Sequence, residues 1–308
     1  MIFAMLISEN TMDVFTEHLR TFLKVCELKS FTKAAQTLRK TQSTISTQVA
    51  VLEQDTGLQL LDRSQRPIHL TEAGEIFSSL ARQIVNSTDQ LGRSIRELAG
   101  GVAGEVKIAT TTSIGAFILP KIVGRLLQEM PRVRLDITIK SLSSVCESVK
   151  QAETDFGIIL SQREPPALVA KSLKPERLCF VVSPGHSLAG SMVRLEELRS
   201  HSFVVGARTG GYTEMIQRLL ERNGLFGFEV ALRVGSFEAI KEAVRSGLGI
   251  GVLPEFMVRR EIRSGVLAEI STKKNNFSAN ITLIERPGYT PTPTVESVRG
   301  FIHKMMTS

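Results

Sequence analysis

Short polar side chains gather between residues 42 and 47, where the sequence reads Gln-Ser-Thr-Ile-Ser-Thr. A glutamine can form a two-pronged pair with adenine, and serine or threonine hydroxyls can bond to phosphates or to several bases. Apolar residues at i, i+4 and i+7, namely Ile45, Val49 and Leu52, predict a helix that buries one face. The opposite face then carries polar residues at its N-terminal end, which suits a helix that reads DNA bases.

The segments around this helix predict a winged helix-turn-helix. Ser30 and Thr41 can each cap a helix, the first of which has small alanines at its centre. Gly57 can end the second helix, and residues 58–70 predict a short basic hairpin, or wing, before Thr71 caps a long helix.

Positive charge near this segment is local. The chain carries 38 Lys and Arg against 31 Asp and Glu, a net charge of +7, yet its first 100 residues hold 11 of each. One group of cations that could face DNA is Lys29, Lys33, Arg39 and Lys40, and no acidic residue lies between them in the sequence. Arg63 and Arg66 on the wing could face DNA as well. Two alternatives stay open, because Arg63 could pair with Asp62 or Glu53 and Lys40 could be a solvated charge at a helix end.

The long helix carries an apolar stripe. Residues 71–98 contain no proline, and an apolar side chain recurs every seventh residue at Phe77, Ile84, Leu91 and Leu98. Such a stripe predicts a coiled-coil seam between two copies of the chain, along a helix of about 40 Å. The alternative is that the stripe packs on the core of its own domain.

Beyond Gly100, Gly101 and Gly104 the pattern changes to short apolar strands that alternate with helices. This alternation predicts βαβ units and mostly parallel sheets, in two open α/β units in series. The expected strands cover 106–110, 135–139, 156–160, 178–183, 203–205, 229–234 and 250–253, and the expected helices cover 116–130, 144–152, 213–223, 237–246 and 294–305.

Hydroxyl groups mark the end of the first of these strands, at Thr111, Thr112 and Ser113. A helix that begins there would offer free N–H groups and a dipole to a carboxylate, sulfonate or phosphate, although the hydroxyls could simply cap it. Candidates at other strand ends that could face the same crevice are Leu142, Ser143, Ser161, Arg208 and Phe237. Of these, Arg208 could neutralise an anionic effector or be a surface charge.

Enzyme chemistry has little support in the sequence. The five histidines lack metal-ligand spacing, residues 185–190 do not match a nucleophile elbow, and residues 247–251 precede a strand, the reverse order of a dinucleotide fingerprint. The three cysteines lie far apart in apolar surroundings and predict buried, reduced thiols. No segment resembles a signal peptide or a membrane span, so we expect a cytoplasmic protein that is neither an enzyme nor a secreted solute-binding protein, and that holds no metal or cofactor.

The chain resembles the LysR-type transcriptional regulators over its full length. The head pattern consists of ordered segments with near-constant spacing, which are Phe-Thr-Lys-Ala-Ala at 31–35, Gln42 with Ser46 and Gln48, Leu-Glu at 52–53, Leu-Asp-Arg at 61–63 and Leu-Thr-Glu-Ala-Gly at 70–74. The resemblance implies an α/β fold class with an N-terminal winged helix-turn-helix, a long linker (coiled-coil) helix and a C-terminal periplasmic-binding-protein-like regulatory domain of two α/β subdomains.

The boundaries implied are an unstructured extension over 1–12, the DNA-binding domain over 13–71, the linker helix over 72–100 and the effector domain over 101–308. Within the last, subdomain I takes 104–176 and 284–308, and subdomain II takes 177–283.

The resemblance also implies partners and site residues. Partners are double-stranded promoter DNA, further copies of the chain in dimers and tetramers, RNA polymerase, and a small effector in the cleft between the subdomains. Residues implied to touch DNA are Thr32 and Lys33 at the backbone, Gln42, Ser43, Thr44, Ser46 and Thr47 in the major groove, and Arg63 and Arg66 on the wing. The family usually has Pro and Arg where this chain has Ser43 and Thr47, so we expect a different operator half-site.

Overall fold

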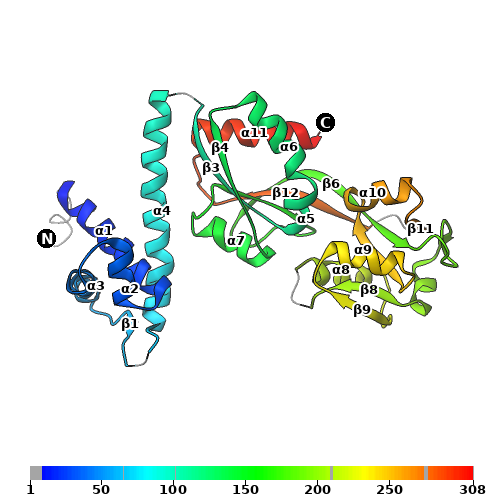
Figure 1. The fold of residues 1–308 in the computed structure, drawn as a ribbon, viewed down its shortest axis with the longest axis horizontal. Helices are drawn as coiled ribbons and strands as arrows, with labels where there is room; N and C mark the ends of the chain where they lie inside the picture. The colour runs from blue at the N-terminus through cyan, green and yellow to red at the C-terminus, as the bar shows by residue number, and fades with distance from the viewer. Residues whose placement is uncertain (1–8, 65, 101, 209–210, 274–276, 308) are drawn as a thin grey trace. The chain divides into compact units, whose positions relative to one another are not determined.

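The computed structural model describes residues 9–64, 66–100, 102–208, 211–273 and 277–307 (Figure 1). The chain folds into two compact units, one of residues 1–99 with 151–153 and one of residues 100–150 with 154–308. Each unit has hydrophobic clusters of its own, so each is described by itself.

The first unit is a helical head followed by a long helix. Its elements are α1 (Glu9–Leu28), α2 (Phe31–Leu38), α3 (Gln42–Thr56), the wing strands β1 (Leu61–Asp62) and β2 (His69–Leu70), and α4 (Glu72–Gly100). The prediction of an unstructured extension was wrong for residues 9–12, since α1 already begins at Glu9 and the chain has no Gly or Pro before Leu28 to interrupt it. Residues 1–8 lie outside the described part of the chain.

The predicted caps are confirmed. The Ser30 hydroxyl accepts a hydrogen bond from the Lys33 amide, and the Thr41 hydroxyl accepts one from the Thr44 amide at 3.1 Å. Thr71 caps α4 through the Gly74 amide at 3.0 Å. At the other end of α3, Gly57 adopts the left-handed conformation with φ +67°. Local sequence therefore fixes where each of these helices begins or ends.

The heptad prediction for α4 is partly wrong. Ala81 is buried in the head's own core, and the Phe77 ring packs edge-on against Phe22 with ring centroids 5.3 Å apart. The stripe that stays exposed is shifted round the helix to Ile76, Leu80, Ile84, Leu91 and Ile95. The first four turns of α4, as far as Val85, thus contribute to the head's core, and Figure 1 shows the helix continuing unbroken beyond them. The side chain of Leu98 lies outside the described ones.

The second unit contains one ten-stranded sheet, with strands β4-β3-β5-β12-β6-β10-β8-β9 in order, β11 paired with β6, and β7 paired with β11. In its first half the strands are β3 (Gly104–Thr110), β4 (Val133–Ile139), β5 (Phe156–Ser161) and β12 (Ser278–Glu285), covered by α5 (Thr112–Phe117), α6 (Leu119–Glu129), α7 (Leu142–Lys150) and α11 (Pro293–Thr307). Strands β3, β4 and β5 are parallel, as predicted.

The second half repeats this plan. Its strands are β8 (Phe203–Gly206), β9 (Val230–Val234), β10 (Ile250–Pro254), β7 (Met192–Val193) and β11 (Ala268–Thr272), with helices α8 (Gly211–Arg222), α9 (Phe237–Arg245) and α10 (Glu255–Arg263) and the short 3₁₀ helix η1 (Leu195–Ser200). Strands β8, β9 and β10 are parallel. The long strand β6 (Val169–Val182) joins the halves, because it pairs with β12 in the first and with β10 and β11 in the second (Figure 1).

Two details differ from the sequence expectation. The helix expected over 116–130 is two helices, since Pro120 lies in the first turn of α6 and cannot donate to a helix running through it. The elements β7, η1, α10, β11 and β12 were not predicted. The glycines at 247–251 form a close turn, in which a Cβ on Gly249 would lie 2.3 Å from the Ser202 carbonyl oxygen.

Gly74 offers a test of the packing between α4 and the wing. A Cβ at this position would lie 2.0 Å from the carbonyl oxygen of Leu60. We expect Gly74→Ala to lower the free energy of unfolding of the head by about 3 kcal/mol, because backbone cannot move aside as a side chain can. Chemical denaturation followed by circular dichroism measures this.

The matched control is Gly124→Ala in α6, where no atom lies within 4 Å of the added methyl group. That change should be neutral or stabilising by up to about 1 kcal/mol, through helix propensity alone. Equal stability of Gly74→Ala and the unmodified chain would contradict the close packing at the wing.

Candidate DNA-binding surface and effector cleft

The polar face of α3 is presented to solvent. Gln42, Ser43, Thr44 and Thr47 are exposed and Ser46 is half-buried, while Ile45, Val49 and Leu52 are fully buried beneath them. The Thr32 hydroxyl of α2 donates to the Gln42 side-chain oxygen at 3.2 Å, so the amide end of that glutamine is held by the neighbouring helix. The Thr41 hydroxyl lies 2.8 Å from that of Ser43 and 2.7 Å from that of Thr44.

The cations around this face differ in their freedom. Lys29, Lys33 and Arg39 are exposed. Lys40 is not a solvated helix-end charge, because its ammonium lies 2.5 Å from a Glu17 carboxylate oxygen and donates to Gln48 at 3.1 Å. The hydrogen bond from Lys40 and its charge lower the pKa of Glu17. Lys40 therefore also ties the turn between α2 and α3 to α1.

Glu53 organises the wing. Its carboxylate accepts hydrogen bonds from the Leu60 amide at 3.0 Å and the Leu61 amide at 3.2 Å, and it pairs with Arg63 at 2.8 Å. The Arg63 guanidinium also lies 5.0 Å from the centre of the Phe31 ring. The ion-pair alternative for Arg63 is thus observed with Glu53, whereas Asp62 accepts from Ser64. Arg66 is exposed at the wing.

A cavity of about 210 Å³ lies between the two halves of the second unit. Five of the eight predicted effector residues line it, namely Thr111, Thr112, Ser113, Leu142 and Phe237. Residues that the prediction left out of the site include Lys140, Ser141, Tyr212 and Thr213. Lys140 is the one charged side chain among the described residues that line this cavity.

Ser143, Ser161 and Arg208 do not line this cavity, so their assignment to it was wrong. Ser143 is exposed, because α7 begins one residue earlier than it and Ser141 takes the cap position, accepting from the Ser144 amide at 3.2 Å. Ser161 lines an adjoining cavity. Arg208 is exposed on the turn after β8. The sequence feature that could have identified Lys140 as a cleft residue is its place directly after β4, next to the hydroxyl-bearing residues that begin at Ser141.

The hydroxyls at Thr111 and Ser113 are not used as a helix cap. Thr111 precedes α5 without a side-chain cap bond, and its hydroxyl lies 3.1 Å from that of Ser113, which is buried. Ser236, in contrast, caps α9 through the Ala239 amide at 3.1 Å. The Thr111 hydroxyl therefore does not cap α5, whereas the Ser236 hydroxyl does cap α9.

Four helices begin at this cavity. Helix α5 follows β3, α7 follows β4, α8 follows β8 and α9 follows β9, and residues of the first turn of each line the cavity. The N-terminus of a helix carries unpaired N–H groups and about half a positive charge. Together with the Lys140 ammonium, which donates to the Ser148 hydroxyl at 2.6 Å, this arrangement favours an anion in the cavity.

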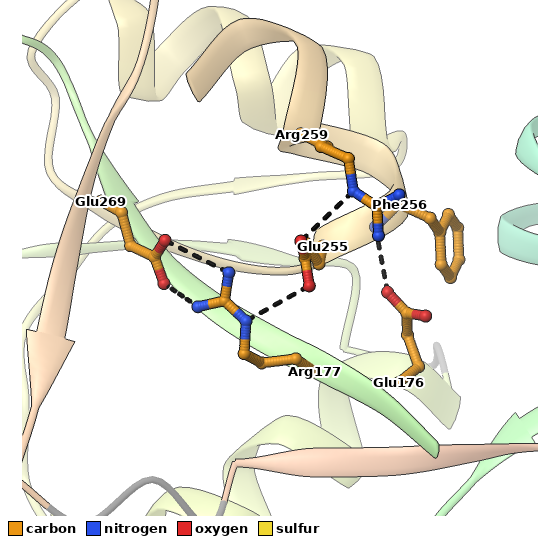
Figure 2. Close-up of polar contacts among 6 residues, drawn as sticks. All are labelled: Glu176, Arg177, Glu255, Phe256, Arg259 and Glu269. Atoms are coloured by element: carbon orange, nitrogen blue, oxygen red, sulfur yellow. Dashed lines mark hydrogen bonds and ion pairs between the residues drawn. The ribbon is translucent and has the colours of Figure 1, made fainter. Parts of the chain in front are cut away.

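A charged network holds the crossing point of the two halves. Figure 2 shows Arg177 of β6 between the carboxylates of Glu255 and Glu269, with Arg259 bonded to Glu255 at 3.2 Å. The neighbouring Glu176 is buried and accepts from the Phe256 amide at 3.0 Å, at the start of α10. Burial raises the pKa of Glu176. The network fixes α10 and β11 to the strand that links the halves.

The structure offers little for redox or metal chemistry. Burial raises the pKa of Cys26 and of Cys179 to about 12, and it also raises that of Cys146. All three thiols are free, but the prediction that they are buried holds only for Cys179, since Cys26 and Cys146 are half-buried. Within the described ranges, no group of three His, Cys, Asp or Glu side chains could hold a metal ion, and no helix is long and apolar enough to cross a membrane.

Comparison with known proteins assigns both units. Residues 16–75 match the family "Bacterial regulatory helix-turn-helix protein, lysR family", and residues 99–307 match "LysR substrate binding domain". The chain is 30% identical over 288 residues to the HTH-type transcriptional regulator CysL of Bacillus subtilis, covering 93% of this chain and 94% of CysL. The chain belongs to the LysR family of transcriptional regulators.

Solved LysR-type structures share the fold. A full-length OxyR variant from Pseudomonas aeruginosa has a TM-score of 0.72 at 21% identity, covering 95% of this chain and 94% of that one. Full-length CbnR in complex with its target DNA has a TM-score of 0.66 at 23% identity, covering 94% and 99%. As a LysR-type regulator, the chain binds promoter DNA through its head and a small-molecule effector, with no cofactor, through its second unit, and it is not an enzyme.

Proposed function

We propose that this regulator reads its operator in the major groove with the exposed face of α3. The observation that carries the proposal is a capped helix whose apolar side is buried and whose N-terminal polar side, from Gln42 to Thr47, is open. Thr32 holds the Gln42 side chain through a hydrogen bond. Lys33 and Arg66 are exposed and can reach DNA phosphates. Arg63 supports the wing through its ion pair with Glu53 and faces the DNA backbone.

The exposed stripe on α4 supports self-association. Ile84, Leu91 and Ile95 are 44%, 61% and 60% exposed, which is a costly arrangement for a lone helix in water. We propose that a second copy covers this stripe to form a dimer, which spaces two recognition helices for an inverted repeat. From the family resemblance we also propose that dimers pair into tetramers, and that the protein contacts RNA polymerase in the cytoplasm.

We further propose that the effector is an anion bound in the cleft. Its support is the meeting of four helix N-termini with Lys140, the hydroxyls of Thr111, Thr112 and Ser113, and no Asp or Glu among the described lining residues. An anion held by both halves would stabilise one closed arrangement of them. That shift, passed on through α4, would alter how two heads engage DNA.

The base-reading role of Gln42 is testable by substitution. Gln42→Ala should weaken binding to the specific operator by about 1 to 3 kcal/mol and leave non-specific binding nearly unchanged, since base contacts specify and phosphate contacts do not. Gel-shift titration of operator and random DNA at one salt concentration measures both.

Gln54→Ala, an exposed position near the other end of α3, is the matched control and should change neither affinity. Equal losses on operator and random DNA for Gln42→Ala would show that Gln42 does not read bases.

The dimer proposal predicts the effect of a charge in the stripe. Leu91→Asp should give a monomer at micromolar concentration and weaken operator binding by a factor of about a hundred, because the second half-site is no longer bound by the same particle. Sedimentation and gel shifts measure the two effects.

Met192→Asp serves as the control, because Met192 is 67% exposed but lies outside the stripe. A dimeric Leu91→Asp protein would place the self-association surface elsewhere.

The anion proposal predicts which cation matters. Lys140→Gln should weaken binding of sulfate, phosphate or a small carboxylate about tenfold or more, since it removes a charge-assisted hydrogen bond from the cavity, while operator affinity without anion is kept. Calorimetry with each anion and an effector-free gel shift measure this.

Arg208→Ala is the control, because that exposed side chain does not line the cavity. If Arg208→Ala lost anion binding and Lys140→Gln kept it, the effector would lie outside the described cavity.

A further inference from the structure

A second cavity, of about 240 Å³, lies wholly within the second half of the regulatory unit. It lies between α8 and the strands β8 and β9, and β9 is the last strand of the sheet, so the cavity is at the sheet's open edge. Its apolar lining includes Phe203, Ile216, Leu220, Leu225, Phe228 and Val252. The cavity is partly open to solvent, and apolar side chains of its lining lack packing partners on the side that faces it.

Two contacts order the wall of the cavity. The Tyr212 hydroxyl donates to the Val252 carbonyl oxygen at 2.9 Å, which fixes the first turn of α8 over the sheet. The rings of Phe203 and Phe228 pack with centroids 4.5 Å apart. These contacts place rigid aromatic side chains around the space rather than in it.

Two opposite charges line the same cavity without pairing with each other. Arg233 is in register with Val205 of β8, and therefore projects from the face of the sheet that α8 covers. Glu221 lies on α8, one turn beyond Gln217, whose amide donates to it at 2.9 Å. Among the described residues, no carboxylate lies within 4.0 Å of the Arg233 guanidinium and no cation within 4.0 Å of the Glu221 carboxylate.

We propose that this cavity binds a free amino acid with a large apolar side chain. The apolar lining would take the side chain, Arg233 the α-carboxylate and Glu221 the α-ammonium group. A plain carboxylate would meet repulsion from Glu221 and a plain amine repulsion from Arg233, so the pair selects a zwitterion.

The site is separate from the effector cleft but shares a wall with it. Gly206, Tyr212 and Thr213 line both cavities, and a Cβ on Gly206 would lie 2.3 Å from the Thr213 hydroxyl oxygen. An amino acid bound here would therefore contact side chains that also line the cleft, which offers a route for a second signal.

Calorimetry on the full-length protein tests the proposal with L-phenylalanine and L-leucine as probes. Each should bind, while 3-phenylpropanoate, which lacks the ammonium group, and phenethylamine, which lacks the carboxylate, should bind at least tenfold more weakly. Arg233→Ala and Glu221→Gln should each weaken L-phenylalanine binding at least tenfold. Neither residue is buried, and thermal melting checks that the variants remain folded.

Arg218→Ala and Glu214→Gln are the matched controls, since both residues lie on α8 but do not line this cavity, and they should bind L-phenylalanine normally. Lys140→Gln, in the cleft, should also bind it normally. Absence of binding by both amino acids, equal binding of either analogue, or undiminished binding by folded Arg233→Ala and Glu221→Gln would overturn the proposal.

Discussion

In the second unit, the direction of the parallel strands decides where chemistry can occur. Strands β3, β4, β8 and β9 are each followed within a few residues by a helix. Because parallel strands point the same way, the helices that follow them begin at the carboxyl ends of the strands, and in both halves these ends border the cleft. The cleft is thus electropositive with a single lysine among its described lining residues, since unpaired N–H groups supply the rest.

One continuous strand, β6, joins the halves that border this cleft. Strand β6 changes partners along its length, from β12 to β10 and β11, and Arg177 and Glu176 anchor α10 and β11 at the change (Figure 2). The effector cleft and the cavity beneath α8 share Tyr212 and Thr213 as lining residues, so a ligand in either one would contact the same part of the second half.

The head achieves rigidity in a different way, through short-range caps and a small core. Glu53 shows how the parts depend on one another, because one carboxylate satisfies two wing amides and holds Arg63 against Phe31. The N-terminal polar face of α3 can stay open to solvent because the side chains that pack α3 into the core, Ile45, Val49 and Leu52, lie on its other side. Stability and recognition are thus separated by helix face.

The sequence by itself determined the local features. Ser30, Thr41 and Thr71 cap their helices as predicted, and the alternation of strands and helices predicted the α/β fold correctly, because capping and hydrophobic periodicity depend on residues a few positions apart. Only the tertiary structure decided which of several residues with the same local pattern is buried, exposed or part of a site. Phe77 and Leu91 share one heptad position, yet one packs in the head and the other is exposed. Likewise Lys140, not Arg208, lines the cleft, because strands distant in sequence set which cation meets which helix ends.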